Sequence, residues 1–308
     1  VAAAQQGFCL VVAARYDNRR IVRDVRCGEH VEFALDADLK PRVGHWSNYP
    51  MTVARRVARN FPGAGRGADV AFASDLPPAA GMSSSSAMIV AMFLVLAEAN
   101  GLYGRPEFRK NIHDPVELAG YLATIENGQT FGSLAGDRGV GTFGGSEDHT
   151  AILNCRPRQL SEFAYCPVRF LRTVAMPEAY TFAIGSSGVV AEKTGAAMEK
   201  YNRASGLAAE LAELWRAATG RSDPHVAAAL GSGPEAAGRL IDVVRSAGLD
   251  EVRTEALLAR LEHFVGENEQ LRPEAGDALA RGDVAALGPL GDRSQKLAEQ
   301  FLRNQVPQ

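Results

Sequence analysis

Long hydrophobic runs, paired cysteines and blocks of basic charge are all missing from this sequence. The longest apolar run, residues 88–97, is too short to cross a bilayer. The four cysteines form no C-x-x-C pair, which argues against a zinc site or a disulfide framework and favours reduced thiols in a cytoplasmic protein. A net charge of −3 without a basic block argues against a nucleic-acid or acidic-membrane partner.

Three common catalytic patterns are absent as well. There is no G-x-S-x-G elbow, so a serine hydrolase is disfavoured. No lysine follows the serine cluster at 83–86, so the Walker pattern is not met. The six histidines lie far apart along the sequence and suggest no metal cluster, so each is expected to be satisfied or exposed.

The remaining composition is that of an ordinary globular protein. A length of 308 residues, 46% hydrophobic and 22% charged, suits one large domain or two.

Strands and helices are mixed in the first half, and helices dominate from residue 223, with the boundary near 156–175. The expected strands are 8–15 (buried), 20–26, 31–35, 68–73, 151–155 and 180–186. The expected helices are 46–61, 83–100, 114–126, 190–218 with a break at 205–206, and further helices separated by Gly231, Gly248, Gly266 and Gly282.

The helix expected at 46–61 is amphipathic. Its apolar residues recur at helical spacing and should face inward. The arginines between them suggest either an anion patch or a solvated face, and the solvated face is favoured. The inward residues are Val53, Val57 and Phe61, and the outward ones are Arg55, Arg56 and Arg59.

The turn at 74–87 is the most informative stretch of the chain. Pro77 and Pro78 stop the preceding strand, because proline cannot donate to a ladder. Small residues at 79–81 allow a ligand to approach the backbone. Ser83 to Ser86 lie where a helix begins, and its unpaired N–H groups and positive end suit an anion, most often phosphate. A serine-capped core helix is the alternative.

A phosphate site at this turn needs positive charge from elsewhere, most simply Mg²⁺ held by a serine hydroxyl and a carboxylate. A glycine-rich loop at 128–145 leads into Glu147-Asp148-His149. Phosphoryl transfer to an alcohol needs a carboxylate beside the hydroxyl, to orient it and accept its proton. The alternative is that Ser146, Glu147 or Asp148 caps the next element.

Five segments, in order, resemble the GHMP superfamily of small-molecule kinases and its galactokinase branch. Residues 76–87 closely resemble the second signature, which wraps the nucleotide phosphates at a helix N-terminus. His45-Trp-Ser-Asn-Tyr49 resembles a helix start whose tryptophan lies by the nucleotide base. Gly144-Gly-Ser-Glu-Asp148 is similar to the segment with the catalytic aspartate. Residues 192–203 resemble the sugar-contacting segment, and 278–297 resemble the late helices.

The resemblance implies a two-domain α+β architecture. Residues 1–160 correspond to the nucleotide-binding domain, which is ribosomal S5 domain 2-like, and 161–308 to an α/β C-terminal domain rich in helices. The implied activity is ATP-dependent phosphorylation of the anomeric hydroxyl of galactose, in a monomeric cytoplasmic protein. Another sugar 1-kinase (for N-acetylgalactosamine or arabinose) and a catalytically silent sugar and ATP sensor are the alternatives. RNA binding, which the S5-like architecture could suggest, is disfavoured by the negative charge.

The resemblance also assigns roles to single residues. Asp148 would orient or deprotonate the sugar hydroxyl, and Gly145 and Tyr201 would contact the sugar. Ser85 and Glu126 would bind Mg²⁺. The nucleotide would contact Trp46, Pro77, Ala79, Ala80, Gly81, Met82, Ser83, Ser84, Ser85 and Ser86.

The sequence departs from the family in four places. The first signature, an arginine followed by Ile-Gly-Glu-His-x-Asp, and the third, glycine-rich signature are not in it. We therefore expect a fragment that is weak or inactive without the signature arginine. The loop at 127–140 is longer than typical, which leaves open whether Glu126 or Glu147 serves Mg²⁺. Glu147 and His149 stand where galactokinases usually have Met and Gln.

Overall fold

The structure is a computed structural model that describes residues 1–77, 81–165, 167–175, 177–185 and 198–303. The chain divides into two compact units. The first comprises Val1–Phe163, Pro167–Leu171 and Thr181–Met198. The second comprises Ala164–Cys166, Arg172–Tyr180 and Glu199–Gln308.

A mixed four-stranded sheet underlies the first unit, in the order β1-β4-β2-β3. β4 pairs antiparallel with β1 and parallel with β2, and β2 pairs antiparallel with β3. All four strands were predicted, but the prediction that β1 is buried was wrong. β1 lies at the sheet edge, and Val11 is 73% exposed. The strands are β1 (Phe8–Ala14), β2 (Arg19–Asp24), β3 (His30–Ala34) and β4 (Ala68–Ser74).

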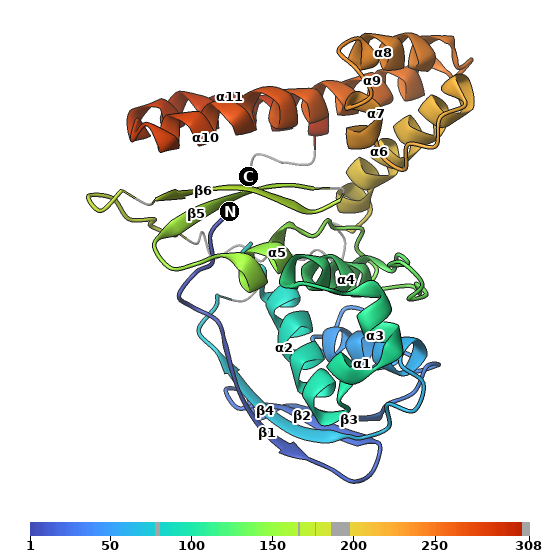
Figure 1. Cartoon of the computed structure of the whole chain (residues 1–308), viewed down its shortest axis with the longest axis vertical. Helices are drawn as coiled ribbons and strands as arrows, with labels where there is room; N and C mark the ends of the chain where they lie inside the picture. Colours follow the sequence, from blue (N-terminus) through green and yellow to red (C-terminus); the bar gives the residue numbers. More distant parts are fainter. Residues whose placement is uncertain (78–80, 166, 176, 186–197, 304–308) are drawn as a thin grey trace. The chain divides into compact units, whose positions relative to one another are not determined.

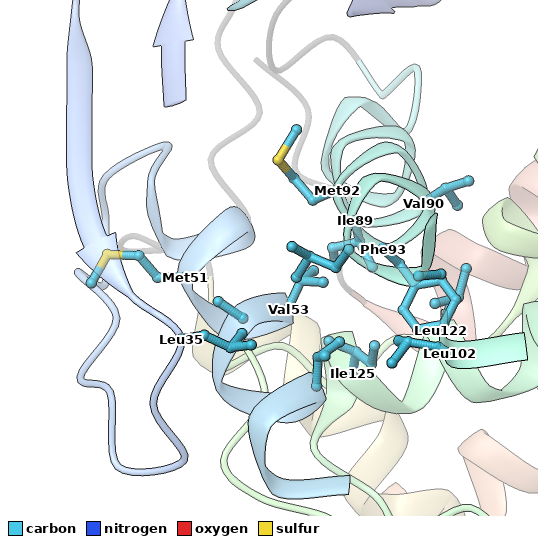
Figure 2. Close-up of a cluster of buried hydrophobic side chains, with 14 of the residues drawn as sticks. Leu35, Met51, Val53, Ile89, Val90, Met92, Phe93, Leu102, Leu122 and Ile125 are labelled. Carbon is cyan, nitrogen blue, oxygen red and sulfur yellow. The ribbon is translucent and has the colours of Figure 1, made fainter. Parts of the chain in front are cut away.

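Helices pack over one face of this sheet and form the core with it (Figure 1). Figure 2 shows buried side chains from three helices meeting there, among them Val53, Phe93 and Ile125. Burying each such side chain contributes about 1.5–3 kcal/mol. The helices are α1 (Asn48–Asn60), α2 (Ser84–Ala99), α3 (Pro106–Asn111), α4 (Pro115–Asn127) and α5 (Glu147–Asn154), with a 3₁₀ turn η1 (Leu102–Gly104).

The arginines of α1 contradict the prediction of a solvated face. Only Arg59 is exposed, whereas Arg55 is 8% and Arg56 0% exposed. Both buried guanidinium groups bind Asp137, with Arg55 Nε 2.6 Å from Oδ2 and Arg56 Nη1 3.4 Å from Oδ1. Arg56 also donates to the Thr124 carbonyl and hydroxyl. Burial lowers the pKa of Arg56. The arginine face of α1 is therefore an internal attachment site for the glycine-rich loop.

Three other predictions fail around residue 150 and beyond. The segment at 151–155 was predicted as a strand, but 147–154 form helix α5. Residues 180–185 form no strand in the part of the chain that the structure describes. Instead, β5 (Gln159–Ala164) and β6 (Arg169–Ala175), which were not predicted, pair in a two-stranded sheet.

The second unit is helical in its described part from residue 199 onward, and helices were predicted to dominate from residue 223. α6 (Met198–Thr219) runs through 205–206 without the predicted break, while residues 190–197 lie outside the described residues. Trp215 is fully buried, packs with Leu211, Leu240 and Leu257, and donates its indole N–H to Asp223 (2.8 Å). α7 (Val226–Leu230), α8 (Ala236–Ser246) and α9 (Glu251–Val265) complete this core.

The last helices of this unit follow each other with few interruptions. The predicted break at Gly266 is wrong, because its φ of −59° is helical and the chain continues through a π-helical segment. Gly248 and Gly282, with φ of 69° and 74°, do interrupt the helical stretch as predicted. The segments are η2 (Gly266–Leu271), α10 (Arg272–Ala280), η3 (Val284–Ala286), α11 (Leu287–Leu297) and η4 (Ala298–Leu302).

Among the described residues, no helix combines the length and apolar character needed to cross a membrane.

A histidine cap at the start of α7 makes the second unit sensitive to pH. His225 Nδ1 accepts a hydrogen bond from the Ala228 amide (3.1 Å), which requires an unprotonated Nδ1. Burial lowers the pKa of His225 below its ordinary value of 6.5, so the unfolded chain binds this proton more readily than the folded one. The contribution of the cap is thus complete above about pH 6.5 and is lost as pH falls below it.

We expect up to about 1 kcal/mol of stability, typical of a helix N-cap, to be lost progressively as pH falls below about 6.5. Urea unfolding can be followed by Trp215 fluorescence in a Trp46→Phe background. His225→Asn should remove this pH dependence, because asparagine caps a helix without titrating. An equal pH dependence in His225→Asn would assign the effect to another group.

Candidate functional site

The turn between β4 and α2 has a strained backbone. Ser83, immediately before α2, has φ 55° and ψ 33°, a left-handed conformation that costs a non-glycine residue about 1–2 kcal/mol. Gly81 has φ 74°, which glycine adopts freely. Among the described residues, the Ser83 side chain caps no amide of α2, so the serine-capped helix is not what forms. Strain of this kind is commonest at ligand sites.

The other residues predicted to bind the nucleotide around this turn vary in exposure. Ala79 and Ala80 lie outside the described residues. Ser86 is buried, and Gly81 is exposed. The half-buried ones are Pro77, Met82, Ser83, Ser84 and Ser85.

The first turn of α2 meets two carboxylates. Ser85 Oγ donates to Glu126 Oε1 (3.2 Å), and Ser86 Oγ donates to Glu126 Oε2 (2.9 Å). Ser86 Oγ also lies 3.4 Å from Asp148 Oδ2. The two serines, Glu126 and Asp148 therefore form one cluster, which we call the serine–carboxylate cluster.

Three helix ends converge to build the serine–carboxylate cluster. α4 starts at Asp114, whose carboxylate accepts from the Glu117 amide (2.8 Å), as predicted, and ends at Gly128 with φ 84°. Glu126 thus lies in its last turn. Asp148 lies in the first turn of α5, near the positive end of that helix dipole. α2, α4 and α5 all pack against one another.

Backbone hydrogen bonds close the glycine-rich loop at its base. The Val140 amide donates to the Glu126 carbonyl (2.8 Å), and the Asp137 amide donates to the Gly128 carbonyl (2.8 Å). Asn127 Nδ2 donates to the Gly144 carbonyl (2.9 Å). Gly139 has φ 58°, and a Cβ there would lie 2.3 Å from the Glu126 carbonyl oxygen, so only glycine fits. The loop therefore returns the chain to the place where it left α4.

His149 is a member of the site that the sequence prediction missed. It was expected to be satisfied or exposed, but it is 1% exposed, and its Nε2 lies 3.3 Å from Glu126 Oε2. Burial lowers its pKa, against the opposing effect of Glu126 and Asp148. Glu147, by contrast, is exposed and donates or accepts no hydrogen bond with either serine in the described part of the chain.

Trp46 and Gly145, predicted to contact the base and the sugar, are not among the residues that form the serine–carboxylate cluster. Trp46, half-buried, donates its indole N–H to Glu29 (2.8 Å) and packs against Phe72, with ring centroids 5.5 Å apart. Gly145 is exposed, with open space where a Cβ would be. Tyr201 belongs to α6, but its side chain lies outside the described residues.

The serine–carboxylate cluster fits a magnesium ion that is shared with phosphates. Ser85 and Glu126 bring a hydroxyl and a carboxylate within 3.2 Å, and hard oxygen ligands are those Mg²⁺ prefers. No group of three or more His, Cys, Asp or Glu side chains among the described residues could hold a metal by itself. Mg²⁺ usually takes only one or two protein carboxylates and completes its coordination with phosphates and water. The donor set suits that arrangement.

Comparison with known families finds a match, which covers the serine turn and Glu126. The profile of the GHMP kinases N terminal domain matches residues 48–137, from the start of α1 to Asp137 in the glycine-rich loop. The chain contains a GHMP kinase N-terminal domain. The matched residues include the serine turn and Glu126, so the two halves of the serine–carboxylate cluster on α2 and α4 both belong to the GHMP kinase domain.

Curated proteins similar to this chain include galactokinases. The galactokinase of Chloroflexus aggregans is 30% identical over 290 residues, and that of a Roseiflexus species is 29% identical over 293. These alignments cover 91% and 92% of this chain but only 62% and 63% of the two enzymes. The chain thus spans less than two thirds of the length of these relatives.

A solved structure shows the same fold. The crystal structure of Lactococcus lactis galactokinase complexed with galactose matches with a TM-score of 0.67 at 19% identity. The match covers 98% of this chain and 69% of that one. The predicted α+β fold is therefore confirmed.

Proposed function

We propose that this chain is part of a sugar 1-kinase that transfers the γ-phosphoryl group of ATP to the anomeric hydroxyl of galactose. The products are galactose 1-phosphate and ADP. The observation that carries the proposal is the serine–carboxylate cluster at the N-terminus of α2, where Ser85, Ser86, Glu126 and Asp148 are joined by hydrogen bonds of 2.9–3.4 Å. The galactokinase homologues support galactose as the sugar.

Different groups of the chain bind the phosphates, hold the metal ion and accept the proton of the sugar hydroxyl. The amides of Ser83 to Ser86 and the half-buried hydroxyls of Ser83 and Ser84 bind the β- and γ-phosphates, because a helix N-terminus attracts anions. Ser85 and Glu126 hold Mg²⁺, which when bound neutralises charge on the phosphate oxygens. Asp148 orients the sugar hydroxyl and accepts its proton as the oxygen attacks phosphorus.

Residues around the cluster position the two substrates. We propose that Trp46 lies beside the adenine base, and that Gly145 and Tyr201 contact the sugar. The open space at Gly145 supports a close approach of a ligand to the backbone there. We assign nucleotide binding to a domain of residues 1–160, and we assign 161–308 to the C-terminal kinase domain. A monomeric cytoplasmic protein stays our expectation.

The proposal is tested by two measurements on the same protein. Calorimetry with ATP or ADP and Mg²⁺ tests nucleotide binding at the serine turn. ADP release with galactose, N-acetylgalactosamine or arabinose then tests transfer, and phosphorus NMR of the product identifies a sugar 1-phosphate. Turnover with galactose is expected to exceed that with the other two sugars. Absence of any nucleotide binding would refute the proposal, and binding of ATP and sugar without turnover in the full-length kinase would identify a sensor instead.

A further inference from the structure

His149 is a buried polar side chain that the proposed reaction does not use. It projects from the first turn of α5 and is 1% exposed. Neither ring nitrogen makes a hydrogen bond with any described residue. Nε2 nevertheless lies 3.3 Å from Glu126 Oε2, so a small rotation of either side chain would complete a hydrogen bond. A buried imidazole without a partner is costly, and a hydrogen bond to this carboxylate would offset that cost.

The two oxygens of Glu126 have different surroundings. Oε2 accepts from Ser86 (2.9 Å), which is 1% exposed, and faces His149, which is equally buried. Oε1 accepts from Ser85 (3.2 Å), which is half-buried. The carboxylate thus has an inner oxygen, surrounded by buried donors, and an outer oxygen beside a hydroxyl that solvent can reach.

We propose that His149 is a positioning residue that fixes the Glu126 carboxylate for the divalent cation. Its Nε2–H donates to Oε2, so that Ser86 and His149 together hold the inner oxygen. Oε1 and the Ser85 hydroxyl are then the pair presented to the metal and the nucleotide phosphates. This inference rests on the proposed function, and it assigns the metal to Ser85 rather than to Ser86.

The physical basis is the support that a metal-binding carboxylate receives from its neighbours. A carboxylate that is free to rotate must lose that freedom when it binds the metal, whereas one already held by donors does not. Ser86 alone cannot supply this restraint fully, since its single proton also faces Asp148 Oδ2 at 3.4 Å. A second donor on the buried side leaves Ser86 able to bond either carboxylate.

The test compares two variants whose substituted side chains have similar length. His149→Gln keeps an N–H donor near the position of Nε2, and His149→Met fills a similar space without a donor. Manganese binding in the presence of ADP is measured by the loss of the free Mn²⁺ signal in electron paramagnetic resonance. ADP binding without metal is measured by calorimetry. Thr150→Val, at the neighbouring and equally buried position of α5, is the control for disturbance of the helix.

We expect His149→Met to weaken Mn²⁺ binding about 10- to 100-fold, the usual effect of losing a partner of a metal ligand. His149→Gln should restore it, and metal-free ADP binding should not change in either variant. Equal Mn²⁺ affinity in the Met and Gln variants would overturn the inference, as would an equal loss in Thr150→Val. If the unsubstituted protein binds no Mn²⁺ with ADP, the proposed function fails and this inference fails with it.

A measurement on the unsubstituted protein covers the case in which His149→Met does not fold. Nitrogen NMR of histidine-labelled protein reports which ring nitrogen carries the proton. A protonated Nε2 whose shift changes when Mg²⁺ and ADP are added together, but not with ADP alone, is the expected result. An Nε2 without a proton would overturn the inference.

Discussion

Replacing Asp137 by alanine should destabilise the first unit by about 3–5 kcal/mol, the usual cost of removing one partner from a buried ion pair. The Asp137 side chain is 3% exposed and faces Arg55, with a 10% exposed side chain, and Arg56, with a fully buried one. Without the carboxylate, both guanidinium groups stay buried with only neutral acceptors. Urea unfolding followed by circular dichroism measures the loss.

An exposed ion pair provides the control for this prediction. Arg19 and Glu32 pair across β2 and β3, with side chains 59% and 39% exposed. Glu32→Gln should cost less than about 1 kcal/mol, because water and ions screen such a pair. Hydrogen exchange should locate the damage from Asp137→Ala in α1 and at residues 128–140. An Asp137→Ala effect as small as that of Glu32→Gln would show that the two arginines do not depend on this carboxylate.

Under the proposed function, Asp148→Asn should lower kcat for sugar phosphorylation by about 10²–10⁴-fold, the usual contribution of a positioned general base. The amide keeps the size of the side chain and can still contact Ser86, 3.4 Å away, but it accepts no proton from the sugar. Nucleotide affinity should therefore remain close to that of the unsubstituted protein. Coupled ADP release measures kcat, and calorimetry with ADP and Mg²⁺ measures the affinity, both in the full-length kinase.

A substitution of the neighbouring Glu147 is the control that distinguishes a specific role of Asp148 from a general effect of lost negative charge. Glu147→Gln removes one negative charge next to Asp148, at an exposed position without a hydrogen bond to Ser85 or Ser86 among the described residues. Its kcat should stay near that of the unsubstituted protein. Full activity of Asp148→Asn would remove Asp148 from the proposed mechanism. A large loss in Glu147→Gln would instead point to the net charge of this region.

Local sequence signals predicted the parts of the fold that depend on neighbouring residues. The proline stop after β4, the serine start of α2 and the Asp114 cap of α4 all act within a few residues, and all three elements are present. The resemblance to galactokinases placed Ser85, Glu126 and Asp148 in one site. In the structure Ser85 donates to Glu126, and Ser86 contacts both Glu126 and Asp148, while the roles of these residues stay predictions.

Interactions between distant residues account for what the sequence did not reveal. Arg55 and Arg56 seemed to face solvent because charged residues usually do, and their carboxylate partner lies 82 and 81 positions away. His149 had no local signal either, since Glu126 comes from another helix. The strand expected at 151–155 failed because a short apolar run fits either a strand or a buried helix.

Because the glycine-rich loop is closed at its base, the number of residues in the loop does not determine the geometry of the site. Glu126 and Asp148 are held by contacts at 127–128 and 137–144, so the residues between 129 and 136 do not set their spacing. Gly132 and Ser133, at the exposed tip, contact α3, because the Ser133 amide donates to Asn111 Oδ1 (2.7 Å) and a Cβ at Gly132 would lie 2.2 Å from that oxygen. The length of this loop, which left the Mg²⁺ role of Glu126 open, therefore does not alter the spacing of Glu126 and Asp148 as long as the contacts at its base are kept.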